Sequence, residues 1–475
     1  MNRIDRKLPS PASGRLAAKL WLSADRPLAH RLLAFAILNG FILNLVLLVL
    51  SLVFLKMRML PRGVLSNSLT VTGLYFFRGI QGTDSWGPML EALRAHAARQ
   101  PIYDTVFFLH HTKFQYPLTS LLPLYALQRL GLDEPSVIHL LNWLSWAAVW
   151  ATIAFCAAIV VRATRNHLPF PSGQSTHTGL LVLTAVLSGL LFFPLMWAYD
   201  LGQIQIFLSL LFSAAFYCWI SGREVPAGVL TGLMILIKPQ YALFAVWFLL
   251  RRRVRSLLAC AAVVCAGFLL AVQLFGWHDH IRYLDVLAFM GKRGETFYYN
   301  LSVNGLMNRL LLNGNSLEYT IHSFPPYHPV VYAVTTITSF FLICFSLFFR
   351  LNSRSRGAGE DFGIAAISMT LASPIAWDHH YGVVLPVFAF LAGRLDRLKH
   401  VGLLAASYVL LSNAWSPANI VARIPGLNIL QSLPLFGVVL LLLMLYRNAG
   451  NNRPKLPDNA NLKSGEFNLA IPSNA

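Results

Sequence analysis

The sequence predicts an all-α polytopic membrane protein, a bundle of about twelve transmembrane helices with a long first extracytoplasmic loop. Hydrophobic residues make up 56% of the chain and charged residues only 12%, which is too little charge to cover the surface of a soluble domain. The mean hydropathy of +0.57 points the same way. The apolar residues also fall in blocks of roughly 20, the length that a helix needs to cross the hydrocarbon of a bilayer.

Polar or charged segments separate the candidate spans. In chain order these spans comprise residues 31–55, 137–161, 178–198, 203–220, 225–237, 240–250, 256–276, 328–350, 362–376, 381–394, 401–416 and 427–446. The two spans that flank Lys238-Pro239 are too short to cross alone, so we expect a hairpin whose tip enters the membrane region. The first outer loop, 56–136, contains an apolar stretch, 115–132, that Pro117 and Pro123 interrupt. We expect this stretch to form a helix in the membrane interface.

Both ends of the chain are expected on the cytoplasmic side. Residues 1–30 are basic and precede a long apolar run without a small-residue cleavage site, which is typical of a signal anchor. Residues 447–475 are rich in Asn, Pro, Lys and Ser and predict a disordered cytoplasmic tail. The membrane domain is then 31–446, and we expect it in the cell inner (cytoplasmic) membrane.

Basic residues in the short loops indicate the orientation. Counting spans from a cytoplasmic N-terminus places the basic clusters at 162–165, 251–255, 350–356 and 394–399 inside. The loop 56–114 is also basic although the same count places it outside, and long loops follow this rule weakly.

The formal net charge of +19, from 38 Lys and Arg against 19 Asp and Glu, fits loops that lie against anionic membrane lipids. No basic stretch interleaved with aromatic residues lies outside an apolar context, so we expect no nucleic-acid partner. All five cysteines lie inside apolar blocks without ligand spacing, which predicts neither a disulfide framework nor a cysteine metal site.

Polar residues that membrane burial makes costly come from distant parts of the chain, and the predicted topology brings them to the outer side. Such residues mark functional sites. They are Asp84, His110, His111, Asp200, Gln203, Gln205, Lys238, Gln240, Asn300, Asn304, Trp377, Asp378, His379 and His380.

Asp84 lies in Gly-Thr-Asp-Ser-Trp and is either a catalytic carboxylate or a helix cap. Tyr116-Pro117 forms an extended bend, and the Tyr116 ring is either an interface anchor or part of the site. The adjacent His110 and His111 are candidates for binding phosphate or metal, although two neighbouring histidines alone indicate little.

Asp200 and Gln203 stand at the start of an apolar span. The free amides of a helix N-terminus suit a sugar hydroxyl or a phosphate, and a simple polar cap is the alternative. Lys238 at the hairpin tip would pair with a phosphate, unless its long stem only carries the charge to the interface. His379 and His380, beside Trp377, suit phosphate binding or proton transfer. Two adjacent histidines do not provide zinc geometry, and no metal is expected.

Together these segments resemble glycosyltransferase family 87, integral membrane enzymes of the GT-C fold class that include polyprenyl-phosphate-mannose-dependent mannosyltransferases. The resemblance covers roughly residues 70 to 445. It rests on Tyr116-Pro117, Gly202-Gln203, Ala227-Gly228 before Lys238-Pro239, Asn300-Leu301-Ser302, and Ser373-Pro374 through Trp377 and His379-His380. The chain departs from the family pattern at Leu118, Gln205 and Asp378.

The resemblance implies a GT-C type bundle and an inverting transfer in which Asp84 is the general base. An inverting transferase needs one carboxylate to accept the proton of the attacking hydroxyl. A lipid phosphate is already a good leaving group, so no second carboxylic acid is needed to protonate it. Cationic and histidine side chains stabilise the charge of the phosphate instead. We assign Lys238 and His380 to the donor phosphate, with His379 as a further candidate. The expected substrate-binding residues are His110, His111, Tyr116, Asp200, Gln203, Gln240, Asn300, Asn304 and Trp377.

The predicted function is therefore transfer of a hexose from a polyprenyl-phosphate sugar to a lipid or glycan acceptor, without a cofactor. Mannose is favoured by the resemblance alone. A transporter or flippase of lipid-linked sugars is the alternative, but it would show paired broken helices in two inverted repeats, and only one Lys-Pro break is present. A membrane scaffold without enzymatic activity is the third possibility.

Overall fold

The structure, a computed structural model, describes residues 28–60, 67–77, 82–167, 174–349, 351, 358–394 and 398–451 of the 475-residue chain. These parts are helices and connecting loops without a strand, apart from one isolated bridge between Asn300 and Trp377. Most of the segment 1–30 and of the expected tail 447–475 lies outside the described residues. The last helix continues to Asn451, so the first residues of that expected tail are helical.

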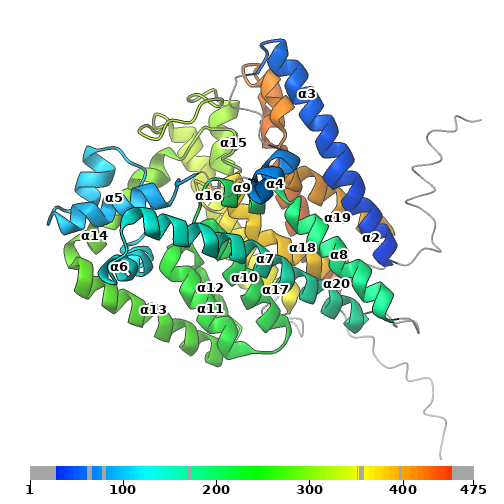
Figure 1. Ribbon diagram of the computed structural model, residues 1–475, viewed down its shortest axis with the longest axis horizontal. Coiled ribbons are helices and arrows are strands. Elements are labelled where there is room, and N and C mark those ends of the chain that lie inside the picture. The colour runs from blue at the N-terminus through cyan, green and yellow to red at the C-terminus, as the bar shows by residue number, and fades with distance from the viewer. Residues whose placement is uncertain are drawn as a thin grey trace, which may run out of the picture.

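The elements follow one another along the chain as α-helices and short 3₁₀- or π-helical segments, the latter labelled η (Figure 1). Their bounds are α2 (Leu28–Ile37), η1 (Leu38–Leu43), α3 (Asn44–Lys56), α4 (Ser68–Phe77), α5 (Trp86–Ala97), η2 (Asp104–Leu109), η3 (Leu118–Leu121), α6 (Leu122–Arg129), α7 (Glu134–His167), α8 (Gln174–Leu190), α9 (Phe193–Asp200), α10 (Gln205–Ile220), α11 (Glu224–Ile237), η4 (Pro239–Ala242), α12 (Leu243–Leu250), α13 (Val254–Phe275), α14 (Trp277–Arg293), α15 (Val303–Leu310), α16 (Pro329–Phe348), α17 (Gly359–Leu371), η5 (Asp378–Val384), α18 (Leu385–Ala392), α19 (Leu398–Ser412), η6 (Ser416–Val421), η7 (Leu427–Ser432) and α20 (Leu433–Asn451).

Among the described residues, five helices are long and apolar enough to cross a membrane. They are Leu28–Lys56, Glu134–Arg165, Val254–Phe275, Pro329–Phe348 and Leu427–Ala449. A sixth span results if Thr176–Leu190 and Phe193–Asp200, bent by 51° to each other, count as one. The chain is therefore a multi-pass membrane protein. The expected spans 203–220, 225–237, 240–250 and 401–416 correspond to apolar helices of 10–17 residues, and 381–394 falls on part of η5 and the eight-residue α18. The number of about twelve crossings therefore stays a prediction.

Several of the long helices turn apolar side chains outward. Only 11% of the apolar window of Val254–Phe275 and 22% of that of Pro329–Phe348 are buried. Exposed side chains on these two helices include Leu258, Leu269 and Phe340. In Figure 1, α13 and α3 lie at opposite edges of the molecule. Apolar surface of this extent is unfavourable in water, and a lipid bilayer would cover it.

The centre of the bundle is built around α17, in which every residue from Glu360 to Leu371 is buried. Helices α10, α16 and α20 pack against it, and η5 follows directly after it along the chain. The long helix α7 packs against α8, α10 and α18. This core holds η5, with its two histidines, in the interior.

The hairpin expected around Lys238-Pro239 is present. Helix α11 ends before Lys238, which is extended (φ −138°, ψ 109°), and η4 begins at Pro239. Beyond α12, Arg253 Nη1 lies 2.9 Å from Glu224 Oε1 in the first turn of α11. The chain after α12 therefore lies beside the N-terminal end of α11. Lys238 and the basic residues after α12 therefore lie at opposite ends of this hairpin.

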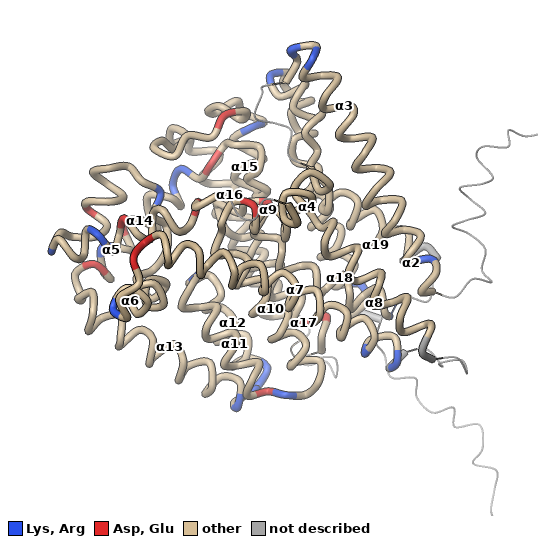
Figure 2. Tube along the Cα trace, in the orientation of Figure 1, with Lys and Arg blue, Asp and Glu red and all other residues tan. Residues whose placement is uncertain are grey.

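The first loop is more structured than expected. It contains α4, α5 and η2, and the stretch 115–132 forms η3 and α6 after the break at Pro117. In Figure 2, most Asp and Glu lie around α5, α6, α14 and α15, whereas Lys and Arg are spread over several parts of the molecule, among them the upper end of α3 and the lower tip between α11 and α13. The carboxylates thus concentrate near the first loop.

Candidate active site

Two loops join to hold Asp84. The backbone nitrogens of Gly82, Asp84 and Ser85 donate to the carbonyl oxygens of residues 200, 201 and 202 at 3.2, 3.0 and 3.3 Å, respectively. Gly202 has a φ of +66°, and a Cβ added there would overlap the carbonyl of Gly82. Only glycine suits this close approach, because it tolerates positive φ and has no side chain. The contact sets Asp84 beside Gln203.

The Asp84 carboxylate is held by a fixed amide. Gln203 Nε2 donates to Asp84 Oδ2, and Gln203 Oε1 accepts from Ser85 Oγ at 2.7 Å and from Tyr116 OH at 3.1 Å. Two hydroxyl donors on the amide oxygen leave the NH₂ group to face Asp84. Burial raises the pKa of Asp84, while the hydrogen bond from Gln203 and the Lys113 ammonium act in the opposite direction.

Lys238 meets the second histidine of η5. Its Nζ lies 2.7 Å from His380 Nε2 and 2.9 Å from Gln205 Oε1. When Lys238 is an ammonium it only donates, and in that state His380 Nε2 accepts and the ring proton lies on Nδ1. His380 Nδ1 is buried and has no hydrogen-bond partner among the described residues. This pair can therefore offer an ammonium and an imidazole N–H to an anion.

Two cavities meet at Asp84. The first, which we name the apolar cavity, has a volume of about 620 Å³; Lys238 and His380 line it, and aliphatic side chains such as Leu243, Val246 and Leu287 cover much of the rest. The second, the aromatic cavity, has a volume of about 690 Å³. Its aromatic lining residues are Trp197, Phe297, Tyr298, Tyr299, Tyr319 and Trp377. The residues common to both cavities are Asp84, Pro88, Tyr319, Ile321 and Trp377.

A buried ion pair adds a residue that sequence reasoning missed. Lys113 Nζ lies 2.7 Å from Glu295 Oε2, and the two side chains are 4% and 9% exposed. The same ammonium lies 4.5 Å from the ring centroids of both Tyr319 and Phe324. Burial lowers the pKa of Lys113, and Glu295 counteracts this. In the sequence Lys113 is one basic residue of a long loop, and its only local signal is the neighbouring His-His and Tyr-Pro pairs.

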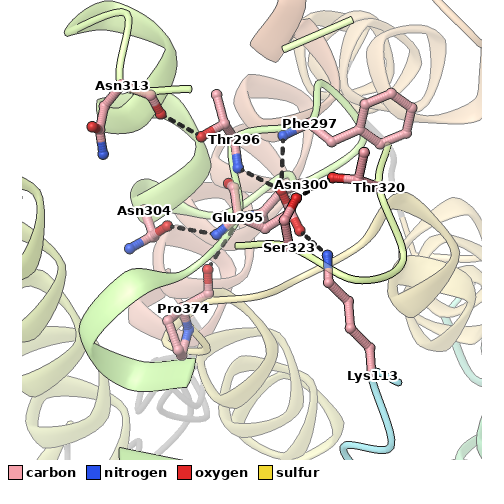
Figure 3. A network of polar contacts seen from close by, with 10 residues as sticks. All are labelled: Lys113, Glu295, Thr296, Phe297, Asn300, Asn304, Asn313, Thr320, Ser323 and Pro374. Carbon is pink, nitrogen blue, oxygen red and sulfur yellow. Dashed lines mark hydrogen bonds and ion pairs between the residues drawn. The ribbon is translucent and has the colours of Figure 1, made fainter. Parts of the chain in front are cut away.

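Glu295 belongs to a wider polar network, which Figure 3 shows around it. Glu295 Oε1 accepts from the backbone of Thr296 at 3.0 Å, and the backbone nitrogen of Glu295 donates to Asn304 Oδ1 at 3.2 Å. Asn300 Nδ2 donates to the carbonyls of Glu295 and Pro374 at 2.8 and 3.1 Å. Asn300 and Asn304 are fully buried and line neither cavity, so they hold the loops together.

The remaining predicted residues fall into two groups. Tyr116 and Gln240 line the apolar cavity. His110, whose Nδ1 lies 2.8 Å from Glu91 Oε1, and the exposed His111 line neither cavity, and Asp200 contacts the Asp84 loop through its backbone carbonyl. Within the described ranges, no three His, Cys, Asp or Glu side chains are grouped as metal ligands.

The family model for glycosyltransferase family 87 matches residues 114–374, which is more than half of the chain. The chain belongs to glycosyltransferase family 87. This confirms the family predicted from the sequence. The matched range includes Tyr116, Gln203 and Lys238, whereas Asp84 and the histidine pair lie outside it.

Two curated relatives are similar to part of this family 87 chain. A polyprenol-phosphate-mannose-dependent alpha-(1-2)-phosphatidylinositol mannoside mannosyltransferase of Mycolicibacterium smegmatis is 29% identical over 242 residues, 47% of this chain and 50% of the relative. A polyprenol-phosphate-mannose-dependent alpha-(1-2)-phosphatidylinositol pentamannoside mannosyltransferase of Mycobacterium tuberculosis is 26% identical over 257 residues, 54% of this chain and 55% of the relative. The chain thus spans about half the length of these relatives. No solved structure matches it significantly.

Proposed function

We propose that this protein transfers a hexose, mannose in the first instance, from a polyprenyl-phosphate donor to a lipid or glycan acceptor, with inversion at the anomeric carbon. The observation that carries the proposal is the position of Asp84, which lines both of the adjoining cavities. A transferase that joins two substrates needs its base where their sites meet. The family and the donors named for the two relatives support the polyprenyl-phosphate class.

The apolar cavity suits the donor. Its aliphatic side chains would cover the first units of a polyprenyl chain, and Lys238 with His380 would bind the phosphate. A preorganised cation and an imidazole N–H stabilise the charge that grows on a departing phosphate. A lysine without an anionic partner is costly in an apolar environment, and a bound phosphate would therefore account for Lys238 at this position.

The transfer is a single displacement. The acceptor hydroxyl oxygen attacks the anomeric carbon from the face opposite the phosphate, and its proton passes to an Asp84 carboxylate oxygen. The bond between the anomeric carbon and the phosphate oxygen breaks, and its electron pair leaves with polyprenyl phosphate. Gln203 keeps the carboxylate oriented during this step. Because burial raises the pKa of Asp84, its carboxylate is a stronger base than an ordinary one.

We also propose that the site faces the extracytoplasmic side of the inner membrane, within a GT-C type bundle of about twelve spans. Helix α11 has 14 residues and separates Lys238 from the Glu224–Arg253 end of the hairpin by about 21 Å, at 1.5 Å per residue. The basic residues at that far end, Arg252, Arg253 and Arg255, are the type that anchors cytoplasmic loops.

The test uses purified protein in lipid nanodiscs with polyprenyl-phosphate mannose carrying a radiolabelled sugar, and a membrane glycolipid fraction as acceptor. We expect labelled glycolipid from the wild type and a decrease of about 10²- to 10⁴-fold in Asp84→Asn, the usual contribution of a general base. Asp285→Asn, on the exposed face of α14, is the matched control and should transfer at the wild-type rate.

An Asp84→Asn variant with full activity would show that the base is another group. A wild-type protein that transfers no sugar, but moves intact lipid-linked sugar across liposomes, would replace this proposal with the transporter alternative. Labelling of a Lys238→Cys variant from the cytoplasmic side, without the same labelling of the wild type, would refute the proposed orientation.

A further inference from the structure

The adjacent histidines of η5 serve different cavities. His380 lines the apolar cavity and contacts Lys238, whereas His379 lines the aromatic cavity. Their ring centroids are 4.8 Å apart and the rings are nearly perpendicular, at 86°. Neighbouring residues in a 3₁₀ turn point in different directions, so a vicinal pair can supply two sites.

The two cavities also differ in their chemistry. The lining of the aromatic cavity contains few aliphatic side chains. Its aromatic rings contact one another: the ring centroids of Trp197 and Tyr299 are 5.7 Å apart, and those of Phe297 and Trp377 are 6.4 Å apart. Polar side chains, among them Glu91, complete its lining. Flat ring faces with a few polar groups suit a pyranose, which presents C–H groups on its faces and hydroxyls at its edge.

His379 has an unused hydrogen-bonding atom in this cavity. The residue is 4% exposed, and its Nε2 has no hydrogen-bond partner among the described residues. Its ring is nearly parallel to that of Trp377, at 18°, with centroids 6.4 Å apart. An unpaired buried polar atom is unfavourable, and a ligand hydroxyl would satisfy it.

We propose that the aromatic cavity binds a pyranose ring of the acceptor and that His379 Nε2 forms a hydrogen bond with one of its hydroxyls. This inference rests on the proposed function, because it takes the apolar cavity as the donor site. It separates His379 from the donor phosphate, to which the sequence assigned both histidines. The acceptor is then a glycan or glycolipid whose sugar, and not its lipid chain, is recognised beside Asp84.

The kinetic test compares His379→Phe with His380→Phe, using polyprenyl-phosphate mannose as donor and octyl α-D-mannopyranoside as acceptor. Phe keeps the ring and removes the hydrogen bond. We expect His379→Phe to raise the acceptor KM about tenfold, the effect of one lost hydrogen bond, without a change in the donor KM. His380→Phe should raise the donor KM instead. His379→Gln, which restores a polar group, should recover part of the acceptor KM.

A binding measurement separates this inference from the proposed function. Wild-type protein in nanodiscs, without donor, is titrated with octyl mannoside, glucoside and galactoside below micelle formation, and with octanol, while tryptophan fluorescence is recorded. Saturable binding of at least one glycoside supports the sugar site if His379→Phe weakens that binding about tenfold. This holds even if the protein transfers no sugar, because missing transfer would count against the proposed function alone. Equal binding of octanol, no binding of any glycoside, or an effect of His379→Phe on the donor KM alone would overturn the inference.

Discussion

Replacing Glu295 by Gln should destabilise the protein because it leaves the Lys113 ammonium without its counter-charge. Both side chains are at least nine-tenths buried and the N–O distance is 2.7 Å. Removing one partner of a buried ion pair costs about 3–5 kcal/mol, since the remaining charge stays desolvated. The 4.5 Å contacts with Tyr319 and Phe324 offset only part of this cost.

The expected change in thermal midpoint follows from chain length. An unfolding entropy of roughly 2.1 cal/mol/K per residue gives about 1 kcal/mol/K for 475 residues, so Glu295→Gln should lower the midpoint by about 3–5 °C. The assay is thermal unfolding in detergent micelles at one fixed scan rate. Lys113→Met with Glu295→Gln removes both charges, and much of the stability should return because no unpaired charge remains.

Asp285→Asn is the matched control. Asp285 pairs with Arg282 at the same 2.7 Å, but the side chains are 57% and 34% exposed. Exposed pairs contribute about 0–1 kcal/mol, which predicts a decrease of under about 1 °C. If Glu295→Gln unfolds at the same temperature as Asp285→Asn, or if the double variant is less stable than Glu295→Gln, the reasoning from burial is wrong.

Three further predictions concern the site and the bundle. Because the pKa of Asp84 is raised and the base must be ionised, acidification should abolish transfer at a pH above the pKa of an ordinary carboxyl group. Lys113→Met removes a positive charge that lowers this pKa, so the loss of activity in a pH–rate profile should move to still higher pH. An unchanged profile would contradict this role of Lys113. Gly202→Ala should reduce both the rate of transfer and the stability, because the added methyl group separates the two loops that hold the Asp84 carboxylate. A folded variant with the kcat of the wild type would contradict this prediction. Arg251 is fully buried and contacts the Asp361 carboxylate at 2.8 and 2.9 Å, so Asp361→Asn removes its counter-charge. The variant should lose about 3–5 kcal/mol of stability in thermal unfolding, without a change in the KM of either substrate.

Much of the fold could be predicted because membrane helices are encoded locally. The apolar blocks at 256–276 and 328–350 correspond within a few residues to α13 and α16, since a run of about 20 apolar residues has few other stable states in a bilayer. The helices of the first loop could not be placed in this way. Helix α5 has only 12 residues, too few to cross a membrane, and its side chains contact residues that are distant in the sequence, such as Phe207 and Phe275.

The site was predictable in its members more than in its arrangement. Asp84, Lys238 and His380 are candidates from the sequence because ionisable residues are costly near hydrocarbon, and the structure brings all three to the lining of one cavity. His110 and His111 met the same criterion but line neither cavity. Polarity alone does not distinguish a residue at a loop surface from one directed into a pocket.

The membrane class and the family follow from the sequence alone, and so do the candidate site residues, because hydrophobic block length and short motifs act over distances of a few helical turns. Three relations become visible only in the folded bundle: Asp84 lies where two cavities meet, His379 and His380 line different cavities, and Lys113 pairs with Glu295, 182 residues away. These relations depend on how loops from distant helices pack, and that packing is a property of the whole bundle.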